Sequence, residues 1–256
     1  MPPSLVVTLD PEGVEIKFVK KHISFDKKDV LEVGCGEGRL TFQYAPEAKS
    51  VTAIDPSQKS ILSARRKIPK SFVGILKFRV GRGEDLDFDD VSFDLVFFTW
   101  SLCCTDISAM GKAVREAWRV LRPRGVLVSI QPSLQQPFHS GMAAYLVDRN
   151  FGPVPQEDDA YAKSRLALKH SSLVERRFAL VAEEEFPNYT YYSSERELLK
   201  NLIPGKKERY RMLGAKAKEQ VREVVRESGI KTSKGIRTQE TAVLTVLRKA
   251  EAPSPP

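Results

Sequence analysis

Apolar residues along this chain gather in short runs, and these runs alternate with segments whose apolar positions recur at three- and four-residue steps. Short runs rich in valine, isoleucine, leucine and phenylalanine are typical of buried strands, whereas the wider spacing is typical of amphipathic helices. Strands that alternate with helices favour a doubly wound α/β sheet with helices on both faces. The runs predict seven strands, at 29–32, 51–55, 76–80, 93–98, 125–130, 178–192 and 241–247.

The helical segments carry recognisable start and stop signals. Asp106 is a plausible N-cap for a helix that continues through Leu121 and stops before Pro123 and Gly125. Ser194 and Glu197 form a capping box, which predicts another helix. A longer helix is expected to follow and to end at 228–229, and a short one is expected to start at 10–12 and to pack over the ligand site.

The stretch 32–38 is the most informative part of the chain, because an acid at a strand end leads into three glycines two residues apart. A strand, a tight glycine loop and a following helix would turn the free N–H groups of the helix toward a ligand. Asp55 closes the next strand, at the spacing at which such a unit brings an acid to a ribose. A tight turn alone would explain the glycines, and a strand-end cap alone would explain Asp55. The two features together predict a nucleotide-type cofactor site.

The glycine pattern differs from the G-x-G-x-x-G of dinucleotide folds, because an acid precedes it and the glycines are evenly spaced. In this form it resembles the glycine motif of the class I methyltransferases, in particular the small-molecule branch of the ubiquinone/menaquinone-biosynthesis type. The resemblance implies S-adenosyl-L-methionine as the cofactor. It also implies a seven-stranded, mostly parallel sheet whose last strand is antiparallel, with helical insertions after strands five and six.

The segment 81–88 resembles the family's loop G-D-A-E-x-L-P-F, which lies against the adenine. Arg82 stands at the position of the aspartate that usually meets the adenine amino group, and Gly83 replaces a small alanine. Either Glu84 or Asp85 takes over that contact, or the adenine is held by backbone groups and apolar packing.

Residues 99–101 follow the fourth predicted strand, at the end where open α/β sheets bind their ligands. Trp100 is therefore expected to form a wall of the pocket, although it could also fill the core beside Phe98. The run 117–125 resembles the family's junction R-V-L-K-P-G-G, which supports the fold and says little about the substrate. Its arginines are expected to be solvated and to face the helix dipole.

The resemblance implies a set of site residues. The segment 132–177 is the least family-like part, and we expect it to build the acceptor pocket. His139 is the candidate general base if one is needed, with an exposed helix-end histidine as the alternative. The expected cofactor contacts are Glu32, Gly34, Cys35, Gly36, Gly38, Asp55, Pro56, Gly83, Glu84, Asp85, Thr99, Trp100 and Ser101, and the expected acceptor contacts are Trp100, His139 and Tyr145.

Composition agrees with one domain over 1–250, with a cap at 1–28, insertions at 132–177 and 194–229, and a disordered tail at 251–256. Of the 256 residues 41% are hydrophobic, and no run is long and uncharged enough for a membrane span or a leader peptide. The three cysteines are odd in number and lack metal-ligand spacing, which favours a reducing, cytoplasmic location and predicts no metal.

The net charge of +8 is spread among acidic residues rather than gathered in a basic block. A small-molecule acceptor is therefore favoured, while RNA or protein remains an alternative acceptor. The function implied is in-line transfer of a methyl group, driven mainly by proximity and orientation. A cofactor-binding protein without catalysis is a further alternative. A nicotinamide oxidoreductase is disfavoured because Gly38 falls one residue early for a pyrophosphate turn.

Overall fold

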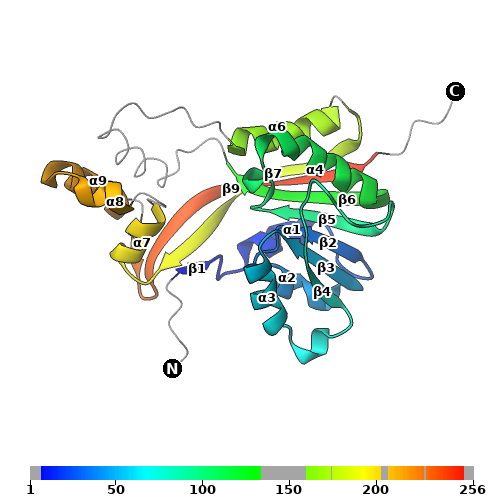
Figure 1. Ribbon diagram of the computed structural model, residues 1–256, viewed down its shortest axis with the longest axis horizontal. Helices are drawn as coiled ribbons and strands as arrows, with labels where there is room; N and C mark the ends of the chain where they lie inside the picture. Colours follow the sequence, from blue (N-terminus) through cyan, green and yellow to red (C-terminus); the bar gives the residue numbers. More distant parts are fainter. Residues whose placement is uncertain (1–6, 134–159, 174, 203–206, 228, 251–256) are drawn as a thin grey trace. The chain divides into compact units, whose positions relative to one another are not determined.

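The computed structural model describes residues 7–133, 160–173, 175–202, 207–227 and 229–250 (Figure 1). Its residues group into two compact units. The larger comprises Glu15–Pro132, Asp159–Phe186 and Ala242–Pro256, and the smaller comprises Met1–Val14, Ser133–Asp158 and Pro187–Thr241. His139, Tyr145, most of the predicted acceptor-pocket insertion and the tail at 251–256 lie outside the described residues, and the single-domain assignment remains a prediction.

The strands follow the order β1-β7-β9-β6-β5-β2-β3-β4, with β8 paired to β9. The family-type order is present, but the described strands number nine instead of seven because β1 and β8, of three residues each, are added. The strands are β1 (Val7–Leu9), β2 (Asp29–Val33), β3 (Ser50–Asp55), β4 (Leu76–Val80), β5 (Phe93–Thr99), β6 (Leu121–Pro132), β7 (Phe178–Tyr192), β8 (Ile230–Thr232) and β9 (Gly235–Lys249).

The helices differ from the sequence expectation in three places. Helix α1 begins at Val14 rather than at 10–12, because Asp10 has a φ of +42° outside the helix, where its Oδ1 accepts a hydrogen bond from the Val14 N–H at 2.8 Å. Helix α4 stops at Val120 rather than beyond Leu121, because Leu121 already pairs with Phe93 in the sheet. The predicted long helix before 228 is two helices separated at Gly214, a residue with low helix propensity. The helices are α1 (Val14–His22), α2 (Thr41–Tyr44), α3 (Gln58–Arg66), α4 (Ile107–Val120), α6 (Ala160–Leu173), α7 (Glu195–Leu202), α8 (Lys207–Met212) and α9 (Ala215–Glu227), with 3-10 turns η1 (Ala45–Glu47), η2 (Lys70–Phe72) and η3 (Leu102–Cys104).

Strand β2 lies at the centre of the parallel part of the sheet. Its Val30 is opposite Val51 of β3 and Leu95 of β5, so the three strands run in one direction and end at the same edge. Strand β9 runs antiparallel to β6, as the resemblance implied. The glycine loop, Asp55 and Trp100 all follow these strand ends and are therefore brought together.

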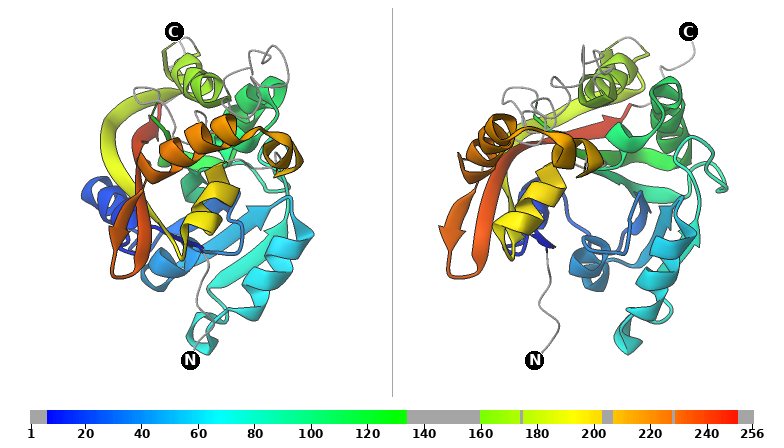
Figure 2. Two further views of the ribbon diagram at one scale, coloured as in Figure 1. Left: turned by 90° about the vertical axis from the view of Figure 1, so that its left-hand side faces the viewer. Right: turned by 60° about the vertical axis from the view of Figure 1, so that its left-hand side comes forward.

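Alternation along the strands separates two buried faces. On one face, the side chains of Val96 and Phe98 join a core that includes Met110 and Val114 of α4, and α6 packs beside α4 (Figure 1). On the other face, Phe97 stacks on Tyr44 with ring centroids 5.5 Å apart. Helix α3 packs along β3 and β4 (Figure 2). Both faces are thus covered, as a doubly wound sheet requires.

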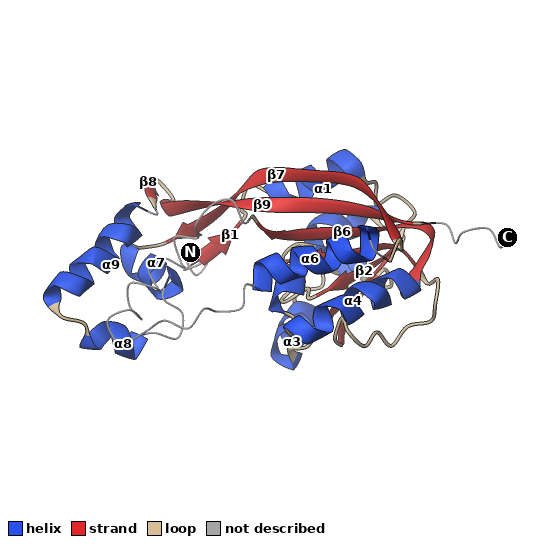
Figure 3. Ribbon diagram, turned by 90° about the horizontal axis from the view of Figure 1, so that it is seen from above, coloured by secondary structure: helices blue, strands red, loops and turns tan. Residues whose placement is uncertain are grey.

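The smaller unit contains α7, α8 and α9 (Figure 3). The predicted cap of α7 is confirmed in one half of the capping box, because the Ser194 hydroxyl accepts a hydrogen bond from the Glu197 N–H at 3.3 Å, whereas the Glu197 carboxylate accepts one from Lys200 Nζ. Leu198, Val221 and Val225 form its small apolar core. Among the described residues, no helix of either unit is long and apolar enough to cross a membrane.

Candidate functional site

A cavity of about 420 Å³ lies at the carboxyl ends of the parallel strands. This volume is within the range of small-molecule and cofactor sites. Strand ends and the loops after them supply the whole lining, which belongs to the larger unit. The lining residues are Val33, Gly34, Asp55, Pro56, Gly81, Arg82, Gly83, Glu84, Trp100, Ser101, Cys104, Thr105 and Asp106.

Asp55 is held rigidly at the end of β3. Its Oδ2 accepts a hydrogen bond from the Gly36 N–H at 2.8 Å, and its Oδ1 accepts one from the Ser57 N–H at 2.8 Å. A carboxylate oxygen can accept more than one hydrogen bond, so both oxygens keep acceptor capacity toward the cavity. The glycine loop and the predicted ribose ligand are therefore one connected unit.

The three glycines of the loop are required for different structural reasons. An added Cβ at Gly34 would lie 2.1 Å from the Ser101 Cβ, so glycine is needed there for β2 to pass β5 closely. An added Cβ at Gly38 would lie 2.8 Å from the Phe42 ring. At Gly36, with φ of +54°, a Cβ would meet nothing within 4 Å. Only Gly36 leaves open space beside the backbone, as a ligand cradle requires.

Glu32 does not line the cavity. Its side chain turns to the α2 face of the sheet, where it is 1% exposed and its Oε2 accepts hydrogen bonds from the Thr41 hydroxyl at 2.6 Å and the Tyr44 hydroxyl at 2.7 Å. Burial raises the pKa of this carboxyl to about 7, against the opposing effect of the two hydroxyls. In this structure its contacts are those of a support beneath the glycine loop rather than those of a ligand.

Trp100 has a strained backbone and a fixed side chain. Its φ is +55°, a region that a bulky residue rarely adopts. The indole Nε1–H donates a hydrogen bond to Oε1 of Glu15, at 2.9 Å, and Arg39 also donates to that buried carboxylate. Helix α1 thus orients the indole, as expected of a helix that packs over the ligand site, and Trp100 lines the cavity.

The loop after β4 supplies a further part of the wall. Glu84 lines the cavity, is held by Arg82 with Nη1 3.2 Å from its Oε1, and has only 19% of its side chain exposed. Asp85 does not line the cavity. Of the two acids that the sequence left open for the adenine contact, the geometry favours Glu84.

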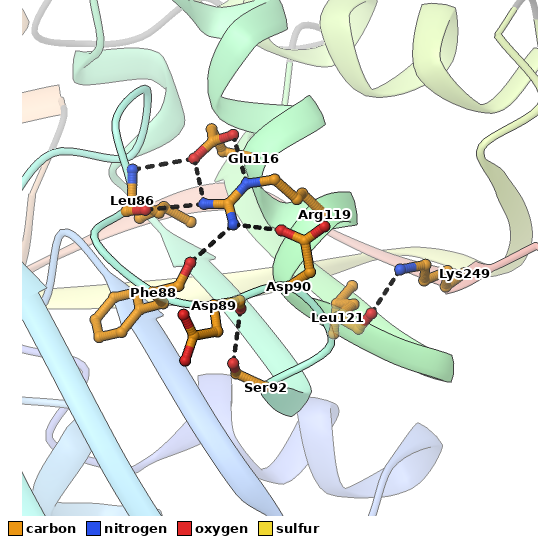
Figure 4. Close-up of polar contacts among 9 residues, drawn as sticks. All are labelled: Leu86, Phe88, Asp89, Asp90, Ser92, Glu116, Arg119, Leu121 and Lys249. Atoms are coloured by element: carbon orange, nitrogen blue, oxygen red, sulfur yellow. Dashed lines mark hydrogen bonds and ion pairs between the residues drawn. The ribbon is translucent and has the colours of Figure 1, made fainter.

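Arg119 of α4 holds this loop from outside the cavity (Figure 4). Its guanidinium donates to the carbonyls of Leu86 and Phe88, at 2.8 Å each, and pairs with Glu116 and Asp90. Glu116 in turn accepts the Leu86 N–H at 3.1 Å. The expectation that the arginines at this junction are simply solvated is therefore wrong for Arg119, whose side chain is only 29% exposed.

The sequence-predicted residues separate into two groups. Seven line the cavity: Gly34, Asp55, Pro56, Gly83, Glu84, Trp100 and Ser101. Glu32, Cys35, Gly36, Gly38, Asp85 and Thr99 are near it in sequence but are not part of the lining. The predicted contacts did not include six further lining residues, whose position at or after a strand end was the available signal: Val33, Gly81, Arg82, Cys104, Thr105 and Asp106. No cluster of metal-ligating side chains occurs among the described residues.

The part of the chain that forms the cavity is similar to known methyltransferases. Residues 31–129 match the family model described as a methyltransferase domain. A ubiquinone/menaquinone biosynthesis C-methyltransferase, UbiE, from Rickettsia bellii is 31% identical over 123 residues, which cover 43% of this chain and 49% of that protein. The chain thus spans about half the length of the curated relatives it matches.

Solved structures share the fold over nearly the whole chain. BH2331 from Bacillus halodurans C-125 has a TM-score of 0.62 at 17% identity, covering 93% of this chain and all of that chain. A SAM-dependent methyltransferase from Methanosarcina mazei has a TM-score of 0.55 at 18% identity, covering 91% of this chain and 96% of that one. Residues 31–129, which contain the whole cavity wall, are thus similar to a methyltransferase domain, and the chain shares the fold of S-adenosylmethionine-dependent methyltransferases of known structure.

Proposed function

We propose that this protein transfers the methyl group of S-adenosylmethionine to a small-molecule acceptor. The observation that carries the proposal is the single cavity in which Asp55, Glu84 and Trp100 meet beside the glycine loop. The matched methyltransferase domain supports the reaction type. The names of the UbiE relatives, which describe methylation in quinone biosynthesis, support a small acceptor.

The polar groups of the cavity lining fit an adenosyl ligand. Asp55 would bind the ribose hydroxyls, because both of its oxygens are fixed and keep acceptor capacity. Glu84 would accept a hydrogen bond from the adenine amino group in place of the family's aspartate, and Arg82 would hold it there. The open space beside Gly36 would admit the amino-acid part of the ligand.

When bound, S-adenosylmethionine supplies an activated methyl group on a sulfonium. The chain must then position an acceptor atom in line with that methyl and exclude water. Trp100 is suited to both tasks, since its ring is a cavity wall and its indole N–H is fixed by Glu15. Fixed positioning of this kind can lower a reaction barrier by about 7 to 11 kcal/mol. His139 and Tyr145 remain predicted acceptor contacts, and His139 the predicted base.

Calorimetric titration of an Asp55→Ala variant with S-adenosylhomocysteine tests the assignment. We expect the affinity to fall by about 1 to 3 kcal/mol, or roughly 5- to 150-fold, because charge-assisted hydrogen bonds to the ribose are lost. Asp87→Ala is the matched control, since that carboxylate is 94% exposed and does not line the cavity. Equal affinity of Asp55→Ala and wild type would remove Asp55 from the site.

A further inference from the structure

A second cavity in the larger unit, of about 250 Å³, is lined by residues of α6, β7 and β9. It shares no lining residue with the cofactor cavity, which contains Asp55 and Trp100. Its volume exceeds the roughly 150 Å³ in which an apolar protein cavity already holds a benzene molecule. A small ligand therefore fits. The lining residues are Arg165, Leu168, Lys169, Ser172, Leu180, Glu183, Thr245 and Leu247.

One part of this lining is apolar. Leu168 of α6 and Leu247 of β9 are each 2% exposed, so they form the inner part of the cavity. Leu180 of β7 is 58% exposed and lies where the cavity opens to solvent. An alkyl chain in the cavity would contact the two buried leucines and remove the exposed one from water, which favours binding.

The other part of the lining is charged, and its arginine is incompletely paired. The Arg165 side chain is only 16% exposed, and its Nη2 is 3.4 Å from Oε1 of Glu183, a long contact for an ion pair. Its Nε is buried and has no hydrogen-bond partner among the described residues. Burial of an unpaired donor costs free energy, and an acceptor from a ligand would remove that cost.

We propose that this cavity binds a medium-chain alkyl carboxylate, whose head group accepts hydrogen bonds from Arg165. The alkyl chain of the ligand packs on Leu168, Leu180 and Leu247. A carboxylate suits a guanidinium, because its two oxygens can accept hydrogen bonds from two parallel N–H groups. Lys169 adds a second positive charge to the lining. The site is independent of the proposed methyl transfer, since the two cavities have separate walls.

Glu183 is the competitor for the Arg165 guanidinium. Two carboxylates beside one cation repel each other, so Glu183 opposes an incoming carboxylate. Its side chain is 31% exposed, which allows it to turn toward water when the ligand binds. The proposal therefore predicts opposite effects of two substitutions. Loss of the Arg165 charge weakens binding, and loss of the Glu183 charge strengthens it.

Calorimetric titration of the full chain with sodium octanoate tests the site. We expect one equivalent to bind, with a dissociation constant of about 0.1 to 1 mM for a ligand of roughly ten non-hydrogen atoms. Arg165→Gln should weaken binding at least fivefold, and Glu183→Gln should strengthen it about threefold. Arg115→Gln is the matched control with unchanged affinity, because that α4 side chain is 47% exposed and does not line the cavity.

Three results of these titrations would overturn the proposal: no saturable binding of octanoate, an unchanged affinity in Arg165→Gln, or an unchanged or lower affinity in Glu183→Gln. If Arg165→Gln does not fold, Glu183→Gln still decides, since a gain in affinity does not arise from lost structure.

Two further titrations identify the head group and the cavity. Octan-1-ol has the same chain without a charge and should bind at least fivefold more weakly than octanoate. Equal affinity of the two would overturn the carboxylate site. Saturating S-adenosylhomocysteine should leave the octanoate affinity unchanged, whereas competition would place octanoate in the cofactor cavity and overturn the proposal. If S-adenosylhomocysteine itself does not bind, the proposed function fails, while the variant titrations still decide the carboxylate site.

Discussion

The glycine loop and the 81–92 loop form two parts of one cavity wall, yet they are held in place by different means. Backbone groups fix the glycine loop: the N–H groups of Gly34 and Cys35 donate to the Ile54 carbonyl at 2.8 and 3.0 Å. The middle of the 81–92 loop is fixed mainly by two side chains of α4, Arg119 and Glu116. The first loop depends on local sequence and the second on long-range side-chain contacts. The loop held mainly by side chains should therefore be the easier to release.

Arg119→Met is expected to have the largest effect. It leaves the carbonyls of Leu86 and Phe88 and the carboxylate of Glu116 without their donor, which should reduce the free energy of unfolding by about 3 to 4 kcal/mol. S-adenosylhomocysteine should also bind more weakly, because the loop carries Glu84. Urea denaturation and calorimetry measure the two effects. Arg119→Lys keeps the positive charge but loses the planar guanidinium that donates to several acceptors at once. Its free energy of unfolding and its affinity for the ligand should therefore lie between those of wild type and Arg119→Met. Wild-type values for Arg119→Met would contradict the comparison.

Glu32→Gln tests the support beneath the glycine loop through pH. The pKa of Glu32 is about 7 when folded and near 4.5 in an unfolded chain, so the folded state binds the proton more tightly. Wild-type stability should therefore lose about 3 kcal/mol from this group as pH rises from 4.5 to above 7. The variant lacks that loss, so its stability relative to wild type should increase over this window. Urea denaturation of both proteins at pH 5 and pH 8 measures this change in the free energy of unfolding. A difference between the two proteins that does not vary with pH would mean that the Glu32 carboxyl has a more polar environment.

Gly34→Ala should have a smaller effect, of about 2 kcal/mol on unfolding. The new Cβ would meet Ser101 at 2.1 Å, and φ of +79° disfavours any side chain. Ser101→Gly in the same chain should recover part of the loss. Gly36→Ala is the control, with about 1 kcal/mol expected, because only its φ of +54° is unfavourable. Equal losses at both glycines would mean that close packing against Ser101 is not the constraint.

The same contrast explains what could be predicted from sequence. The glycine loop, Asp55 and Trp100 lie at strand ends, and strand runs are readable from local patterns, so their meeting at one edge was predictable. The face to which Glu32 turns depends on its alternation with Val33 and on partners nine and twelve residues away, Thr41 and Tyr44. Arg119 reaches a loop about thirty residues earlier in the chain, and no local pattern encodes that contact.

Calorimetric titration of the purified protein with S-adenosylmethionine, S-adenosylhomocysteine and NAD, at one salt concentration, tests the central claim most directly. The account predicts micromolar binding of both adenosyl sulfur ligands and none of NAD. Binding of NAD, or no binding of any of the three, would contradict the assignment of the cavity to an S-adenosylmethionine-dependent methyl transfer.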